Sequence, residues 1–394
     1  MEAPDLFANA ATRFPESLCV TDGERRRTFA EADERAARGA AALLGAGLVR
    51  GDRVALLAEN ELDYLELIAA CGRAGLPIVP INYRLALPEL EYIIGDCSPR
   101  LLIAGRGYAE TARRLGVPLT WHLGEEAAGP SYEAAVAAAA PASERQLIDA
   151  AAPGRIVYTS GTTGRPKGAV ISQGAIAARL AMIALEGDIQ PGYSFVQGLP
   201  MFHIAADISC AFSYRAGANI FMRGAFDPAK LVGVIEAHRP THMVLVPTQI
   251  NLLCEEPRLA EIDRSSLRVL IYGASGIPPE VLKRALRLLG CGFLQFFGMT
   301  ELSGCSMLRP ADHDPEAHPE LLPSAGKDAL SYYSKVIGPE GHELPAGEVG
   351  EVIARGPCMM DGYWNDAEAT AAALRGGWMH TGDLGYRDPA GYLF

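Results

Sequence analysis

The stretch Tyr158–Gly168 reads Y-T-S-G-T-T-G-R-P-K-G, and it carries the most information about fold and chemistry in this sequence. The preceding run Arg155–Tyr158 predicts a short buried strand. Three glycines in the stretch let backbone N–H groups turn toward an anion, because no Cβ stands in the way. Its hydroxyl and ammonium groups are further donors to an anion. We therefore expect a phosphate-binding loop, whose donor side chains are Thr159, Ser160, Thr162, Thr163 and Lys167.

This loop is not of the Walker type. That pattern has four residues between its first glycine and a Gly-Lys pair, whereas here Arg165 and Pro166 precede Lys167 and the spacing differs. The alternative is a polar surface loop. We disfavour it because ordinary loops rarely gather so many hydroxyls, glycines and a lysine directly after a buried strand.

Length and charge limit the classes of protein that this chain can belong to. Its 394 residues exceed what one core usually holds, so we expect two or more subdomains. The formal net charge of -12 argues against a nucleic-acid partner or an anionic membrane surface. An acidic protein that handles a nucleotide needs a local positive site, and Lys167 supplies one.

The cysteines and the termini indicate a reduced compartment. Eight cysteines are scattered, without a C-x-x-C pair or a zinc-like cluster. The segment Met1–Asp5 is acidic and lacks a signal-peptide pattern. No apolar run reaches the roughly 18 residues that span a bilayer. We expect a cytoplasmic protein without a membrane segment.

Strand-like and helix-like stretches alternate along most of the chain, which predicts doubly wound, layered α/β subdomains with parallel strands. From about residue 324 the pattern changes to short extended pieces broken by Gly and Pro, which predicts a small antiparallel β-barrel-like subdomain. The expected divisions are residues 1–152, 153–323 and 324–394. Expected strands are 53–57, 77–80, 241–246, 267–272, 293–297, 335–338, 348–355 and 378–381, and expected helices are 61–71, 88–95, 227–238 and 278–289, with an Ala-rich helical patch and linker over 127–152.

A second motif, Gln295–Glu301, reads Q-F-F-G-M-T-E, in which a strand is expected to enter a glycine turn and then present a hydroxyl and a carboxylate. A Thr-Glu pair alone is more typical of a helix cap. Beside a phosphate loop it favours a site for a nucleotide and a hard cation, because such a cation offsets the repulsion between a carboxylate and phosphates. Further motifs are P-M-F-H at 200–203, Y-G-A-S-G at 272–276 and H-T-G-D-L-G at 380–385.

Taken together, these motifs resemble the acyl-adenylate-forming superfamily of acyl-CoA synthetases, aryl-CoA ligases, adenylation domains and luciferases, along nearly the whole chain. The resemblance implies that Glu301 holds Mg²⁺, that Thr300 contacts the α-phosphate and that Asp383 accepts hydrogen bonds from the ribose hydroxyls. The implied catalytic residues are Thr163, Lys167, Thr300, Glu301 and His203. The implied nucleotide-binding residues are Thr159, Ser160, Gly161, Thr162, Gly164, Gly273, Ala274, Ser275, Gln295, Phe296, Phe297, Gly298 and Asp383.

The resemblance also implies an acyl pocket. His203 and Val246–Thr248 would line it, and a His suits a plain carboxylic acid where amino-acid-activating relatives place an Asp for the substrate ammonium. A lone His is equally often structural. Phe296 stands where many members have Gly, so it should shorten or reshape the acyl tunnel. Phe297 would stack on adenine where Tyr is usual. Gln173 and the segment Ser324–Lys327 depart from the family pattern without removing an assigned group.

We expect an ATP-dependent acyl-CoA synthetase that forms an acyl-adenylate from a hydrophobic or aryl acid and transfers it to CoA. Alternatives are an adenylation enzyme that loads a carrier protein, an enzyme that uses a preformed acyl-adenylate, and a nucleotide-binding protein without turnover. The sequence stops at Phe394, where family members continue into a C-terminal lid domain with a catalytic lysine. This suggests a truncated form, which should bind ATP but turn over about 10²–10³ times more slowly. The oligomeric state stays open.

Overall fold

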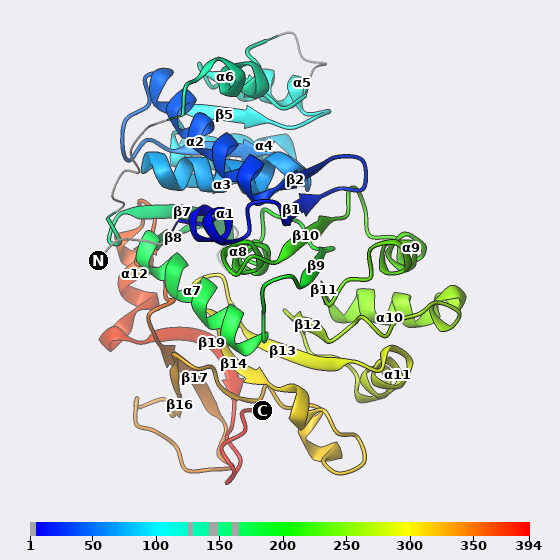
Figure 1. The fold of residues 1–394 in the computed structure, drawn as a ribbon. Helices are drawn as coiled ribbons and strands as arrows, with labels where there is room; N and C mark the ends of the chain where they lie inside the picture. The colour runs from blue at the N-terminus through cyan, green and yellow to red at the C-terminus, as the bar shows by residue number, and fades with distance from the viewer. Residues whose placement is uncertain (1–4, 125–128, 142–148, 160–164) are drawn as a thin grey trace.

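The computed structural model describes residues 5–124, 129–141, 149–159 and 165–394. Over these residues the strands form sheets of nine, seven and three strands, which we call the large, second and small sheets. Figure 1 shows the second sheet in the upper part of the molecule, the large sheet in the middle and the small sheet at the bottom. The mixed α/β architecture with parallel strands confirms the expected fold class.

The large sheet has the strand order β15-β14-β13-β12-β11-β9-β10-β1-β2. Strands β13, β12, β11, β9, β10 and β1 run parallel. At the edges, β2 pairs antiparallel with β1, β14 pairs antiparallel with β13, and β15 pairs antiparallel with β14. Its strands are β1 (Leu18–Thr21), β2 (Arg26–Thr28), β9 (Ser194–Gln197), β10 (Ala218–Phe221), β11 (His242–Leu245), β12 (Val269–Gly273), β13 (Gly292–Met299), β14 (Ser303–Leu308) and β15 (Lys327–Asp328).

The second sheet has the order β18-β8-β7-β4-β3-β5-β6, with parallel strands from β7 to β6 and antiparallel β8 and β18. Its strands are β3 (Val54–Leu57), β4 (Ile78–Pro80), β5 (Leu101–Ala104), β6 (Thr120–His122), β7 (Pro153–Thr159), β8 (Lys167–Ser172) and β18 (Gly362–Tyr363). The small sheet is antiparallel, in the order β16-β17-β19, and consists of β16 (Tyr333–Ile337), β17 (Gly350–Arg355) and β19 (Met379–Gly385).

The sheets cross the chain divisions that the sequence suggested. The early strands β1 and β2 belong to the large sheet, and β7 and β8 belong to the second sheet although they follow residue 152. The sheets therefore do not coincide with the divisions at residues 152 and 323, and the division into subdomains stays a prediction.

Helices pack against the two larger sheets, and capping signals in the sequence explain several of their ends. Thr28 and Glu31 form a reciprocal capping box at the start of α2, and Asp227 caps α9 directly before Pro228. Gly290, at φ 62°, ends α11 in the left-handed conformation that glycine adopts without strain. The helices are α1 (Ala8–Arg13), α2 (Phe29–Gly45), α3 (Leu62–Ala74), α4 (Leu87–Cys97), α5 (Ala109–Leu115), α6 (Tyr132–Ala138), α7 (Gln173–Glu186), α8 (Ala206–Tyr214), α9 (Pro228–His238), α10 (Pro247–Glu255), α11 (Pro279–Leu289) and α12 (Ala367–Ala373), and short 3₁₀ turns lie at 257–260, 310–312, 319–321 and 375–377.

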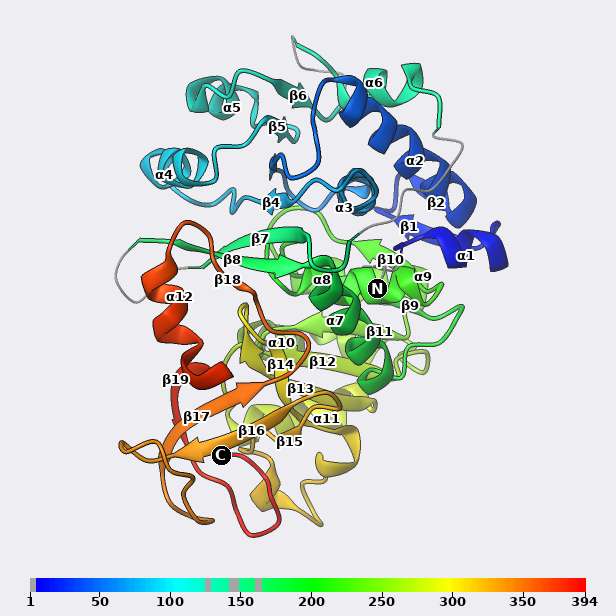
Figure 2. The same ribbon diagram turned by 90° about the vertical axis from the view of Figure 1, so that its left-hand side faces the viewer.

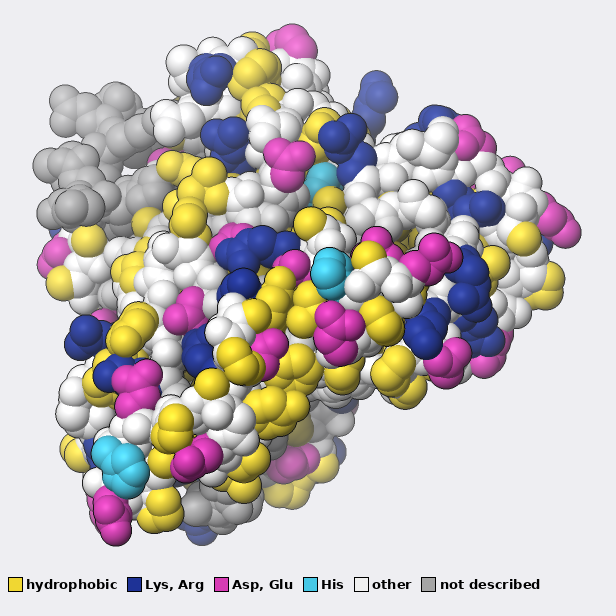
Figure 3. Space-filling model, turned by 90° about the horizontal axis from the view of Figure 1, so that it is seen from below, with side chains coloured by type: hydrophobic (Ala, Val, Ile, Leu, Met, Phe, Trp, Pro, Cys, Tyr) yellow, Lys and Arg dark blue, Asp and Glu magenta, His cyan; other side chains and the backbone are white. Residues whose placement is uncertain are grey.

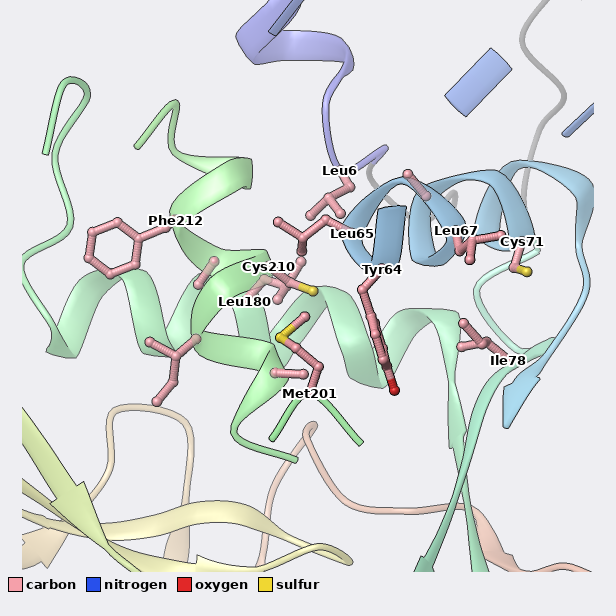
Figure 4. Packing of buried hydrophobic residues seen from close by; sticks show 14 of the residues in the cluster. Leu6, Tyr64, Leu65, Leu67, Cys71, Ile78, Leu180, Met201, Cys210 and Phe212 are labelled. Carbon is pink, nitrogen blue, oxygen red and sulfur yellow. The ribbon is translucent and has the colours of Figure 1, made fainter. Parts of the chain in front are cut away.

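Helices α7 and α8 form the layer between the two larger sheets. They pack against each other, α7 contacts β7 and β8 of the second sheet, and α8 contacts β9 and β10 of the large sheet. Figure 2 shows both helices between these sheets, with α12 and the small sheet alongside. Figure 4 shows that α3 packs onto these two helices, with Tyr64 and Leu65 in the same buried cluster as Leu180 of α7 and Cys210 of α8. One continuous apolar core therefore joins the two sheets.

A buried ion cluster lies inside this core. Asp207 of α8 accepts a hydrogen bond from Nη1 of Arg155 on β7 at 2.5 Å and pairs with Nη1 of Arg179 on α7 at 3.6 Å. All three side chains are at most 3% exposed. Arg179 also donates to the carbonyl oxygens of Cys358 and Thr300, at 2.8 Å and 3.0 Å. The cluster thus connects β7, α7, α8 and the turn after β13.

The surface carries both signs of charge. On the face shown in Figure 3, Lys and Arg side chains are interspersed with Asp and Glu. Such a mixed face does not form a broad basic surface of the kind that binds nucleic acid. In the described part of the chain, none of the helices combines the length and the apolar character needed to cross a membrane.

Replacing Asp207 by Ala should destabilise the protein strongly, because it leaves two buried guanidinium groups without their carboxylate. Breaking such a buried cluster costs about 3–5 kcal/mol. The midpoint of urea unfolding, followed by circular dichroism, measures this. Asp263→Ala is the matched control, since it removes an exposed ion pair with Arg239 and should cost less than about 1 kcal/mol. Equal shifts for both variants would contradict the structural role of the cluster.

Candidate functional site

Several of the predicted site residues lie at the carboxyl ends of neighbouring parallel strands. Strands β9, β11, β12 and β13 run parallel in the large sheet, so the segments that follow them meet at one edge. Ligands of open α/β sheets bind at this edge. The segments in question carry His203 after β9, Val246 after β11, Ala274 and Ser275 after β12, and Thr300 and Glu301 after β13.

An apolar cavity of about 290 Å³ opens beside these strand ends, and we call it the acyl cavity after the acyl pocket that the sequence predicts. No charged side chain of the described residues lines it, and its polar side chains are those of His203, Tyr272, Thr300 and Ser303. The Tyr272 hydroxyl is engaged elsewhere, with His313 at 3.0 Å and Gln295 at 3.3 Å. The remaining lining comes from α7, α8 and the four strand ends, including Ile183, Ile208, Leu245, Val246, Phe296 and Met299.

A second cavity, of about 330 Å³, lies between the large sheet and the small sheet, and we call it the adenosine cavity after the ligand that the sequence predicts for its residues. Asp383 of β19 lines it from one side, while Ala274, Ser275 and the start of the Q-F-F-G motif line it from the other. Asp383 is exposed, and its backbone N–H is bonded to Thr381 Oγ1 at 3.1 Å. The residues predicted to bind the nucleotide that line this cavity are Ala274, Ser275, Gln295, Phe296, Phe297, Gly298 and Asp383.

The acyl and adenosine cavities share part of their walls. Phe296, Gly298 and Ala274 line both. A third cavity of about 270 Å³ adjoins the acyl cavity through His203, Ala205 and Ala274, and Arg84 is an exposed cation on its wall. Desolvation lowers the pKa of His203 and the Arg84 guanidinium lowers it further, so the imidazole is neutral near pH 7.

Two glycines are required where strands approach each other at the shared wall. A Cβ on Gly298 would stand 1.7 Å from the carbonyl oxygen of Ser303, and one on Gly273 would stand 2.4 Å from that of Phe296. Ala274 and Ser303 adopt left-handed backbone conformations, at φ 68° and 67°. Such strain in non-glycine residues concentrates at functional sites.

Thr300 and Glu301 lie in the turn of the β13–β14 hairpin. The sequence predicted a glycine turn before them, but β13 continues through Gly298 and Met299, with a bulge after Phe297 that keeps Gly298 paired with Gly304. The helix-cap alternative is wrong, because a strand and not a helix follows Glu301. Glu301 is 4% exposed, and its carboxylate accepts a hydrogen bond from the Tyr363 hydroxyl at 2.8 Å.

The phosphate loop connects β7 and β8, which pair antiparallel with Thr159 opposite Lys167. The buried strand expected before the loop is present as β7. Lys167 is half-buried, and its Nζ lies 5.4 Å from the centre of the Tyr363 ring. Tyr363 therefore contacts Lys167 through its ring and Glu301 through its hydroxyl. Five predicted site residues lie outside the described residues: Ser160, Gly161, Thr162, Thr163 and Gly164.

The carboxylate of Glu301 fits a magnesium ion that is shared with a ligand. Among the residues that the structure describes, there is no group of three His, Cys, Asp or Glu side chains that could hold a metal. Mg²⁺ is commonly held by one or two carboxylates together with substrate phosphates. Glu301 is a single buried acid that shares Tyr363 as a contact with Lys167, and such an acid fits an ion of this kind.

Sequence reasoning missed several residues of the site. Ile183 and Ile208 line the acyl cavity from α7 and α8, but on a helix they have the spacing of any core residue. Tyr363 lies in a short extended segment, where an aromatic residue indicates packing, and Arg179 is a charged residue in a largely apolar helix. That charge on a buried helix face was the one available signal for Arg179.

Relatives of this chain are identical to it at about a third of the aligned residues. Feruloyl-CoA synthase from Amycolatopsis sp is 35% identical, over 96% of this chain and 75% of the relative. Indoleacetate–CoA ligase from Aromatoleum aromaticum is 33% identical, over 100% and 78%. Fatty acid–[acyl-carrier-protein] ligase ScoC from Streptomyces coeruleorubidus is 34% identical, over 96% and 74%.

Solved structures agree with these sequence matches. The inhibitor-bound N-terminal domain of FACL13 from Mycobacterium tuberculosis superposes with a TM-score of 0.91 at 28% identity, over 100% of this chain and 99% of that one. ATP-bound MatB from Rhodopseudomonas palustris gives a TM-score of 0.89 at 29% identity, over 100% and 78%. The family model described as AMP-binding enzyme matches residues 7–364. The chain therefore belongs to the AMP-binding enzyme family and is an ATP-dependent, AMP-forming acid–thiol ligase.

Proposed function

We propose that this ligase activates a compact apolar carboxylic acid, with an aryl acid as the leading candidate, and transfers the acyl group to CoA. The observation that carries the proposal is the acyl cavity, whose described lining is uncharged and largely aliphatic, with Phe296 on one wall. Its volume of about 290 Å³ lies at the small end of ligand cavities and favours a compact acid over a long chain. Relatives named for ferulate and indoleacetate support an aromatic acid.

The site residues divide the chemistry of adenylation between them. The acid's carboxylate oxygen attacks the α-phosphorus of ATP, pyrophosphate leaves, and a mixed anhydride with AMP results. In this proposal Thr300 binds the α-phosphate, Lys167 and the phosphate loop bind the β- and γ-phosphates, and Asp383 accepts hydrogen bonds from the ribose. Such positioning and charge stabilisation account for most of phosphoryl-group catalysis. Glu301 would hold a magnesium ion, and that ion would supply positive charge to offset the repulsion between the reacting anions.

The third cavity offers a route for the acceptor thiol. It joins the acyl cavity beside His203 and Ala274, where the activated carbonyl would lie, and it carries the exposed Arg84, whose charge suits a phosphorylated thiol such as CoA. The thiolate sulfur attacks the carbonyl carbon, the thioester bond forms, and AMP leaves with the former carboxylate oxygen. A neutral His203 does not add charge to this step.

An acid screen tests the proposed substrate class. Pyrophosphate release from ATP is measured for aryl, medium-chain and long-chain acids, with CoA and without it. We expect the highest kcat/KM for aryl acids and thioester formation only with CoA. A preference for long-chain acids would contradict the substrate class. Thioester formation only on a phosphopantetheinylated carrier protein would instead favour the activity of the ScoC relative.

Lys167→Ala should weaken binding of ATP but not of AMP, because the lysine is assigned to phosphates that AMP lacks. Losing a charge-assisted contact of this kind corresponds to about a tenfold loss of ATP affinity or more. Isothermal titration with each nucleotide measures this. Lys230→Ala, which removes an exposed lysine of α9, is the control. Unchanged ATP affinity in Lys167→Ala would remove Lys167 from the site.

Phe296→Gly should enlarge the acyl cavity, since the ring forms part of its wall. We expect kcat/KM to rise for acids longer than the best wild-type substrate and to fall for that substrate. The ratio of the two values is the measurement. Phe297→Gly is the matched comparison, because Phe297 lines the adenosine cavity and not the acyl cavity. The proposal is contradicted by an unchanged ratio in Phe296→Gly, or by equal changes in both variants.

A further inference from the structure

Tyr363 is the one described side chain for which contacts to both Lys167 and Glu301 are observed. Its hydroxyl donates to Glu301 Oε1 at 2.8 Å, and its ring faces Lys167 Nζ at 5.4 Å from the centroid. Lys167 begins β8 beside the phosphate loop, and Glu301 lies in the β13–β14 turn. These two elements belong to different sheets, so their relative position depends on whatever spans the gap between them.

The backbone on either side of Tyr363 is anchored to the same two elements. On the phosphate-loop side, β18 pairs with β8 with Tyr363 opposite Ala169, and the N–H of Trp364 donates to the carbonyl oxygen of Gly168 at 2.7 Å. On the other side, the N–H of Met360 donates to the carbonyl oxygen of Glu301 at 2.7 Å. The segment 360–364 thus bridges the two sheets, and Tyr363 projects from this bridge.

The Thr300–Glu301 turn has little backbone freedom left. Arg179, fully buried, donates to the carbonyl oxygen of Thr300 at 3.0 Å, and Met360 holds the carbonyl oxygen of Glu301. The remaining freedom is rotation of the Glu301 side chain, whose terminal torsion is intrinsically broad. A hydrogen bond to Oε1 restricts that rotation and leaves Oε2 for another partner.

We propose that Tyr363 is a positioning residue that holds the Glu301 carboxylate and the Lys167 ammonium in their relative places for a triphosphate and its metal ion. The hydroxyl orients the carboxylate, and the ring provides a cation–π platform for the ammonium. Groups that are held in place before a ligand arrives bind it without an ordering cost. This inference rests on the proposed nucleotide site, and it adds to that site a residue that the sequence analysis did not assign to it.

The test is Tyr363→Phe, which removes the hydroxyl and keeps the ring. Isothermal titration without acid measures ATP affinity with Mg²⁺, ATP affinity in EDTA, and AMP affinity. We expect about a tenfold loss with Mg²⁺, the effect of one hydrogen bond to a charged group. ATP in EDTA and AMP should change less than about twofold, since neither uses a metal on Glu301. An unchanged affinity with Mg²⁺, or the same loss under all three conditions, overturns the role of the hydroxyl.

Two further variants separate positioning from general destabilisation. Tyr363→Leu removes the ring as well and should lower ATP affinity even in EDTA, because Lys167 loses its platform. If Tyr363→Leu equals Tyr363→Phe in EDTA, the role of the ring is wrong. Tyr132→Phe is the matched control, because it removes a Tyr–Glu hydrogen bond of the same 2.8 Å length, to Glu66 beside the second sheet, and should leave all three affinities unchanged. Wild-type protein that binds neither nucleotide would contradict the proposed function itself.

Discussion

The buried carboxylate of Asp207 is the interaction on which the arrangement of the site depends. It lies on α8, between the two larger sheets, and it pairs with Arg155 on β7 and Arg179 on α7. Arg155 belongs to the strand that leads into the phosphate loop, and Arg179 holds the carbonyl oxygen of Thr300. One buried charge therefore connects β7 with the β13–β14 turn, the two elements that we propose to contact the phosphates. Buried ion groups add little stability over apolar ones, so a role in specifying geometry explains their presence better.

Sheet topology then places the remaining groups. Because β9, β11, β12 and β13 are parallel neighbours, the four segments that follow them converge without any long loop. Close strand contacts at Gly273 and Gly298 bring the walls of the acyl and adenosine cavities together, so that one strand, β13, serves both. Side chains alternate across a strand, and Phe296 and Phe297 accordingly have different surroundings. Phe297 also packs against Val336 and Val352 of the small sheet, which fixes that sheet beside the adenosine cavity.

The sequence predicted well what depends on local pattern. The buried strand before Thr159, the strand–helix alternation and the antiparallel strands after residue 324 all follow from periodicity and turn residues. It could not predict that β1 and β2 join the large sheet, because strand pairing over such a separation is decided by tertiary packing. Ile183 and Ile208 were equally unpredictable as cavity residues, since an apolar helix face has the same pattern whether it meets a core or a ligand.

Tyr363 illustrates a more general limit. An aromatic residue in a short extended segment predicts packing, and the Tyr363 ring does contact Lys167 from such a segment. The positioning role that we propose for Tyr363 depends on which carboxylate its hydroxyl reaches. That carboxylate belongs to Glu301, which is 62 residues earlier in the chain. Local pattern assigns a residue type to a strand or a core, but it does not show which distant group completes its polar end. A polar contact at such a separation forms only when the fold has brought the β8–β18 pair and the β13–β14 turn together. For this reason a positioning role is harder to predict from sequence than a phosphate loop.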